Sequence, residues 1–209
     1  MGQGSVERKH EVLSSNKSSN IMMPTCQDVD KNGHLEIPYG IRNIPDEAFS
    51  YCDSLRSIVI PDSVESIGNQ AFYYCSSLAS VDIGNSVTVI GYSAFRYCSN
   101  LESVDIPDSV TLIIDYAFSN CSSLESVDIG DSVKNIGSFA FNNSGIRSVD
   151  FLSSVTSING DGAFAYCNNL TSVEIPDSIT SISNGAFLGC SNLESVVIPN
   201  SVKTIGIRA

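Results

Sequence analysis

The sequence predicts an α/β repeat protein: a right-handed solenoid of about eight coils, with one parallel β-sheet and short helical turns on the opposite side. Three regularities support this prediction. A Phe recurs every 23 residues, an Ala precedes each of these Phe residues, and a Cys follows most of them three residues later. The Phe series is Phe49, Phe72, Phe95, Phe118, Phe141, Phe164 and Phe187. Such a fixed period is typical of chains in which every coil repeats one unit of structure.

Each repeat begins with a predicted β-strand. Residues 55–60 fit the pattern L-x-x-L-x-L, and Ile58 and Ile60 alternate with polar or outward positions, so they face the same side of a strand. A single coil cannot bury that side alone, so neighbouring coils must cover it. We therefore expect parallel strands of one sheet, centred near residues 36, 59, 82, 105, 128, 150, 174 and 197.

The remainder of each repeat leads the chain back to the next strand. Pro61 ends the strand, and Asp and Ser at 62–63 supply a turn. Val64 and Ile67 begin the return path. The Ala, Phe and Cys of residues 71–75 suit a short helical turn that packs both small and large groups inward.

The repeat as a whole resembles a known family. The string V-x-I-P-x-S-V-x-x-I-G-x-x-A-F-x-x-C-x-x-L, which residues 94–101 and 104–110 carry well, is similar to the BspA-like class of leucine-rich repeats. The resemblance covers residues 30–209, the expected leucine-rich-repeat solenoid. Residues 1–29 precede it, and we expect them to form a disordered tail.

The resemblance also implies a class of function. Members of the BspA-like class are surface antigens and adhesins of bacteria and parasitic protists that bind host matrix proteins. For this chain the resemblance therefore implies a binding module for a protein partner, a role in cell adhesion and a cell-surface location. The family supplies no catalytic residues, so none is expected here.

Charge and hydropathy restrict the partners. The chain has 23 acidic and 11 basic residues, a formal net charge of −12, which repels phosphate backbones and disfavours nucleic acid as a partner. A basic protein or a divalent cation fits better. No apolar stretch reaches about 18 residues, so we expect no membrane insertion. The first residues lack the apolar core of a secretory signal, so the residues alone leave the localisation unknown, with the cytoplasm as the default.

Six of the seven Cys residues share one position of the repeat, from Cys52 to Cys190. We expect these six to be buried and reduced, because inward thiols behave as small apolar groups. A metal site needs ligands that converge on one point, whereas a column spreads them along a line. Residues 28–33 resemble the first half of a calcium-binding loop, but Tyr39 stands where a bidentate acid is needed, which favours a simple turn. We expect no metal or cofactor.

Enzymatic chemistry is not indicated. The chain has two His residues, His10 and His34, one in the expected tail and one at the edge of the array. No nucleophile–base constellation can be assembled around either. The many carboxylates repeat regularly, as a surface pattern does, so we expect no enzyme.

The outward face of the strands is the candidate binding surface. The candidate residues are Asp82, Asp105, Asp128, Asp150 and Glu174, flanked by Ser80, Ser103, Ser126, Ser148 and Ser172. Like charges opposite one another on neighbouring strands repel, and the repeat does not require an acid there, because Val59 and Val197 occupy the same position. The acids either keep an exposed sheet soluble or bind a Lys- and Arg-rich partner.

An alternative function is structural. The last coil stops at Ala209, where the next Ala-Phe pair would begin, and solenoid ends normally carry a polar cap. This favours a second hypothesis, an assembly unit in which copies of the chain associate through the C-terminal edge.

Overall fold

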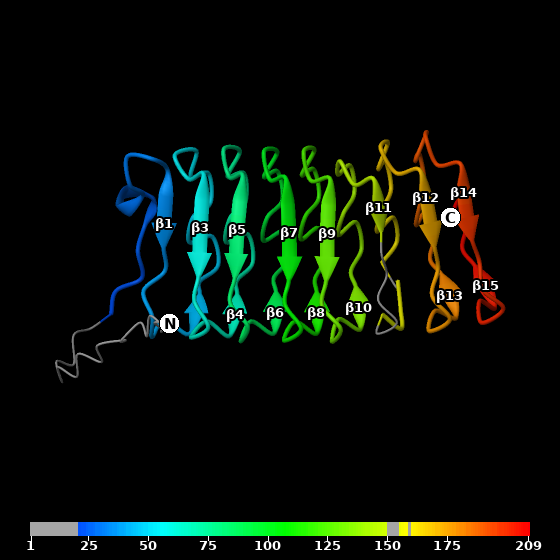
Figure 1. The fold of residues 1–209 in the computed structure, drawn as a ribbon, viewed down its shortest axis with the longest axis horizontal. Helices are drawn as coiled ribbons and strands as arrows, with labels where there is room; N and C mark the ends of the chain where they lie inside the picture. Colours follow the sequence, from blue (N-terminus) through cyan, green and yellow to red (C-terminus); the bar gives the residue numbers. More distant parts are fainter. Residues whose placement is uncertain (1–20, 150–154, 159) are drawn as a thin grey trace, which may run out of the picture.

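A computed structural model describes residues 21–149, 155–158 and 160–209. Its coils stack side by side along one long axis, with β1 at one end of the array and β14 and β15 at the other (Figure 1). The architecture is a parallel β-solenoid of the leucine-rich-repeat type. One buried apolar cluster runs from Leu35 to Phe187 and forms a single continuous core.

One strand per coil forms the first side of the solenoid. The strands are β1 (His34–Glu36), β3 (Ser57–Ile60), β5 (Ser80–Ile83), β7 (Ser103–Ile106), β9 (Ser126–Ile129), β11 (Ser148–Val149), β12 (Ser172–Glu174) and β14 (Ser195–Val197). All of their pairings are parallel, in ladders β1–β3–β5, β7–β9 and β11–β12–β14. The predicted positions and parallel direction of these strands are confirmed.

A second series of short strands lies on the return path, where none was expected. Its members are β2 (Asn43–Ile44), β4 (Ser66–Ile67), β6 (Val89–Ile90), β8 (Leu112–Ile113), β10 (Asn135–Ile136), β13 (Ser181–Ile182) and β15 (Thr204–Ile205). The order β10–β8–β6–β4–β2 makes one five-stranded parallel sheet. The prediction of a single sheet was therefore wrong. Ile67 is buried while Ser66 before it is partly exposed, so this segment also has the alternation of a strand.

The expected helical turns at the Ala-Phe corners are absent from the described residues, where η1 (Cys26–Asp28) is the one helix. The N–H of Phe72 donates instead to the carbonyl of Ala94 in the next coil, at 2.8 Å. Gln70 and Tyr74 on either side have φ values of 54° and 60°, in the left-handed region. Backbone N–H groups that bond to the next coil cannot close i→i−4 helical turns.

The number of coils also differs from the expectation. Seven coils contain a strand followed by an Ala-Phe corner, and the coil of β14 and β15 ends before that corner. The array therefore has about seven complete turns rather than eight. In six of these turns the Phe ring is fully buried, and consecutive rings stack at centroid distances such as 4.9 Å for Phe72 and Phe95.

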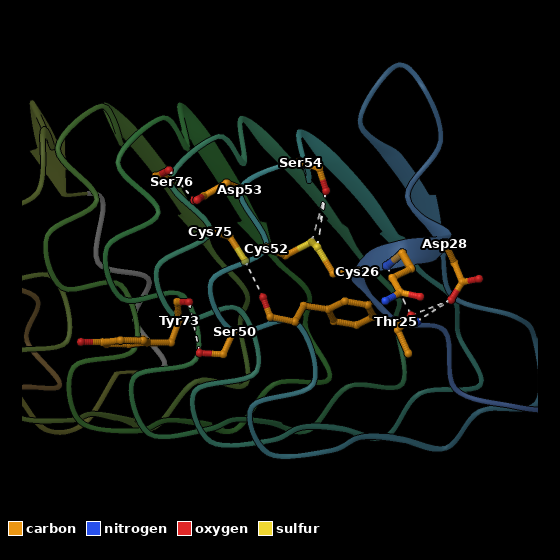
Figure 2. Close-up of a disulfide and its surroundings, with 12 residues drawn as sticks. Thr25, Cys26, Asp28, Ser50, Cys52, Asp53, Ser54, Tyr73, Cys75 and Ser76 are labelled. Atoms are coloured by element: carbon orange, nitrogen blue, oxygen red, sulfur yellow. Dashed lines mark hydrogen bonds between the residues drawn. A yellow bond between two sulfur atoms is a disulfide. The ribbon is translucent and has the colours of Figure 1, made fainter.

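Residues 21–29, which were expected to belong to the tail, form an ordered N-terminal cap, whereas residues 1–20 of that tail lie outside the described residues. Thr25 and Asp28 make a capping box around η1, and Met23 and Val29 pack against the core. Cys26 also packs there and forms a disulfide with Cys52 of the first coil (Figure 2).

The disulfide corrects the expectation for the cysteine column. Cys52 is buried but oxidised, so its predicted reduced state was wrong. The free thiols at the same position of the repeat are Cys75, Cys98, Cys121, Cys167 and Cys190, of which the last is only partly buried. Cys26 lies one 23-residue period before Phe49 and so occupies the Phe position of the repeat. That position is next to the Cys position of the following coil, so Cys26 meets Cys52 and can form a disulfide with it.

Candidate functional site: an acidic hollow on the strand face

Three of the predicted binding residues come together on adjacent strands. Asp82 on β5, Asp105 on β7 and Asp128 on β9 are exposed and occupy the same position of their strands. Asp105 stands directly opposite Asp128 in the parallel register. Hydrogen-bonded strands lie about 4.8 Å apart, so Asp105 and Asp128 place two negative charges close together. Asp82 extends this row from β5, which is not hydrogen-bonded to β7 but lines the same space.

The row borders a hollow of about 650 Å³. We call it the acidic hollow and define it by its five carboxylates. They are Asp82, Asp105, Asp108, Asp128 and Asp131. Asp108 and Asp131 come from the turns that follow β7 and β9. Among the described residues that line the hollow none is basic, so nothing there neutralises the five acids.

The acids of the hollow differ in what they do for the fold. The Asp108 carboxylate accepts a hydrogen bond from the backbone N–H of Asp131, at 2.8 Å, and thereby joins two coils. Asp62 accepts in the same way from the N–H of Asn85, at 2.6 Å. In the described part of the chain, no hydrogen bond or ion pair reaches the carboxylates of the strand-face row. Within the hollow, the Asp108 carboxylate therefore has a role in the fold, whereas the carboxylates of the row have none.

The other predicted site residues are not brought into the hollow. Glu174 on β12 is exposed and stands opposite Val197, but does not line it. Asp150 lies outside the described residues. The five serines of the prediction, all exposed on the same strand face, also do not line the hollow. They are Ser80, Ser103, Ser126, Ser148 and Ser172.

Sequence reasoning missed the turn acids. The signal was present, because an Asp follows the Pro or Gly that ends the strand in several repeats, as in Pro107-Asp108 and Gly130-Asp131. That pattern was taken only as turn chemistry. Only the folded structure shows that the turn lies beside the strand face, so that the acids of the turns and of the strands line the same hollow.

The arrangement can bind positively charged side chains. Carboxylates accept charge-assisted hydrogen bonds from guanidinium and ammonium groups, and Arg can meet them in bidentate fashion.

The described residues contain no group of three or more His, Cys, Asp or Glu placed to hold a metal ion. At the turn into the first coil, the Asp30 carboxylate accepts from the N–H groups of Asn32 and His34, which is the geometry of a turn. No described helix is long and apolar enough to cross a membrane.

Comparisons with known proteins agree with this architecture. A family model described as "BspA type Leucine rich repeat region (6 copies)" matches residues 21–124, 42–168 and 90–209. The chain is similar to a leucine rich repeat protein of T. pallidum, with 30% identity and a TM-score of 0.64, over 85% of this chain and 74% of that one. No curated protein matches the chain.

A second solved structure is a leucine rich cell surface protein of Faecalibacterium prausnitzii A2-165, with 28% identity and a TM-score of 0.53. The similarity covers 83% of this chain and 65% of that one, so this chain spans slightly less than two thirds of that protein. Both similarities extend over most of the described solenoid.

Proposed function

Because this chain belongs to the BspA-type leucine-rich repeat family, we propose that it is a non-enzymatic module that binds a basic segment of a partner protein in the acidic hollow. Leucine-rich repeat proteins generally bind protein partners, and nothing in the described residues points to catalysis. The observation that carries the proposal is the row of Asp82, Asp105 and Asp128, which repel one another and serve no contact of the fold.

Electrostatics favours a basic protein over other partners. The net charge of −12 steers a Lys- or Arg-rich surface toward the solenoid, and the hollow concentrates five carboxylates where that surface would dock. A bound basic segment would neutralise the carboxylates of the row. The repulsion between them would then be relieved, which favours the complex over the free protein. Nucleic acid carries the wrong charge for this surface.

We also infer that the chain works in an oxidising compartment, at the cell surface, where adhesion is the natural role of such a module. Two observations support this. The F. prausnitzii protein to which the chain is similar is a cell surface protein. The Cys26–Cys52 disulfide is of a kind that persists outside the reducing cytosol.

The test uses two variants with the same change of charge. One variant replaces the strand-face row: Asp82→Asn, Asp105→Asn and Asp128→Asn. The control replaces three acids near the Ala-Phe corners: Asp46→Asn, Glu47→Gln and Asp161→Asn. The control residues already occur at the equivalent positions of other coils, as Asn69, Gln70 and Asn184, so the control should fold normally.

Binding is measured with an immobilised Lys-rich peptide over a series of salt concentrations. We expect the strand-face variant to bind about tenfold more weakly, with a shallower salt dependence, while the control binds nearly as well as the unmodified chain. If both variants lose binding equally, only net charge matters and the hollow is not the site. If neither loses binding, the acids only keep the sheet soluble.

A second candidate function is self-association, favoured by apolar side chains on the last coil. Val197, Ile205 and Ile207 are 58%, 58% and 78% exposed. Apolar side chains grouped at a solenoid edge favour contact with another apolar edge. We expect Ile205→Lys with Ile207→Lys to lower the association measured by sedimentation equilibrium. Thr180→Lys is the control, because Lys203 occupies the equivalent position one coil later. A monomer at all concentrations would rule this candidate out.

A further inference from the structure

We propose that the Cys26–Cys52 disulfide is a redox latch: a dithiol reductant opens it, and the N-terminal cap of residues 21–29 then leaves the edge of the first coil while the remaining coils stay folded. The two sulfur atoms lie where the cap meets the first coil, next to the hydroxyl of Ser54 (Figure 2).

The register of the repeat explains why the latch lies there. In the following coils each cysteine thiol donates to the carbonyl of the Phe that lies 26 residues earlier, as Cys75 does to Phe49 at 3.0 Å. Cys98 donates to Phe72 in the same way, at 3.2 Å. Counting back 26 residues from Cys52 leads to Cys26. At this one boundary, the disulfide therefore takes the place of the thiol–carbonyl hydrogen bond that each of the five free cysteines makes.

The disulfide is the main link between the cap and the first coil, whereas neighbouring coils are held together by many contacts. Neighbouring coils share backbone hydrogen bonds, such as that from the N–H of Phe49 to the carbonyl of Ala71, at 2.8 Å. In the described part of the chain, no backbone hydrogen bond joins residues 21–29 to the first coil. The Cys26–Ser54 contact, at 3.4 Å, is the one side-chain hydrogen bond between them. Without the disulfide, little more than the packing of Met23, Cys26 and Val29 holds the cap.

The chemistry is a thiol–disulfide exchange with a dithiol. Its thiolate attacks the Sγ of Cys26, because Cys26 is partly exposed and Cys52 is only 1% exposed. The S–S bond breaks, and Cys52 leaves as a thiolate that takes up a proton. The second thiol of the reductant then attacks the mixed disulfide and releases Cys26, which is also protonated. Two electrons pass to the protein, and the dithiol becomes a disulfide.

The consequence stays local because a solenoid is nearly one-dimensional. Each coil contacts only its neighbours, so the loss of the cap is felt mainly by the first coil and fades along the array. Opening the latch uncovers the apolar edge that the cap protects. The latch thus joins the redox state of the surroundings to the accessibility of one end of the solenoid.

Hydrogen exchange on the full chain tests the latch, with and without dithiothreitol as the dithiol. After reduction we expect the hydrogen-bonded amides of the cap, those of Thr25 and Asp28, to exchange on the order of tenfold faster or more, while the amide of Phe118 in the middle of the array is unchanged. Alkylation and mass spectrometry show how many thiols are free in the same samples.

Two variants separate the latch from a general effect of the reductant. Cys26→Ser should exchange like the reduced chain and should not respond to dithiothreitol. Cys98→Ser should respond as the unmodified chain does, because it removes a thiol of the same column that forms no disulfide. Ser144 already occupies this position in another coil, so the control residue fits the fold.

Three results would overturn the proposal. One is a disulfide that the dithiol does not reduce in the folded chain. Another is exchange at Thr25 and Asp28 that stays the same after reduction. The third is unfolding of the whole array on reduction, seen as faster exchange at Phe118, because the bond would then hold the entire solenoid and not only the cap.

Discussion

The Sγ of Cys121 donates a hydrogen bond to the carbonyl oxygen of Phe95, 3.1 Å away across the boundary between two coils. The same relationship recurs from Cys75 to Phe49 and from Cys167 to Phe141, at 3.0 and 3.1 Å. A neutral thiol can donate in this way and a thiolate cannot. Deprotonation of these buried cysteines would therefore remove hydrogen bonds that hold neighbouring coils together.

This column predicts a loss of stability in alkali. Burial raises the pKa of Cys75 from 9.0 to about 12, and that of Cys121 likewise to about 12. Because the folded pKa is raised, the stabilisation is fully present below about pH 9 and is lost as the pH rises from about 9 toward 12. Each such thiol should lower the free energy of unfolding by about 1.4 kcal/mol per pH unit within that window.

Urea unfolding at a series of pH values from 8 upward measures the effect. Cys121→Ala removes one titrating thiol, so its free energy of unfolding should fall less steeply with pH than that of the unmodified chain, although it starts lower because of lost packing. Since other groups titrate in both proteins, the difference between the slopes isolates the cysteine. Equal slopes would show that the buried thiol does not govern alkaline stability.

The strand-face row predicts a gain in stability from lost charge. Asp105→Asn together with Asp128→Asn should raise the free energy of unfolding by roughly 0.5–1 kcal/mol at low salt, because like charges directly opposite on neighbouring strands repel. The gain should shrink at high salt, where exposed charges are screened. Thermal and urea unfolding measure both.

Asp108→Ala provides the contrast within the same hollow. It also removes one negative charge, yet it should destabilise the protein by about 1 kcal/mol, because the N–H of Asp131 loses its acceptor. If both kinds of variant change stability in the same direction, the distinction between strand-face acids without a role in the fold and Asp108 with one is wrong.

Gly130 predicts a steric effect at the floor of the acidic hollow. A Cβ added to Gly130 would lie 2.6 Å from the carbonyl carbon and oxygen of Pro107, which belong to the backbone of the preceding coil and cannot rotate away. Gly130→Ala should therefore cost about 1–3 kcal/mol, measured by urea unfolding. Ser126→Ala on the same coil is exposed and should change stability by less than about 0.5 kcal/mol. Equal effects would mean that the coils separate easily.

Much of the acidic site could be predicted from the sequence, for a geometric reason. Coils of constant length place a residue beside the one 23 positions later, so Asp105 had to stand beside Asp128 once both strands were parallel. The turn acids could not be assigned to the same site, because their approach depends on how far the chain bends after Pro107. Glu174 shares the column but does not line the hollow, because a shared column does not place every member beside one space.

The corners illustrate what side-chain pattern does not reveal. Arg96 lies 4.9 Å from the ring of Tyr97 and 4.8 Å from that of Tyr116, which belongs to the next coil. Tyr97 and Tyr116 have φ values of 65° and 60°, a conformation that bulky residues seldom adopt. The residue types at these positions do not indicate a left-handed backbone conformation. That conformation is found where a helical turn was expected.

The sequence by itself determined the length of the repeat, the position and direction of the main strands and the inward columns of Phe and Cys, because a period of 23 residues can bury those side chains only by stacking like on like. Only the tertiary structure decided the second sheet, the open corners and the Cys26–Cys52 bond. These features depend on which backbone groups of one coil meet the next. Hydrogen bonds between coils compete there with local helix formation, and the contact between coils prevails.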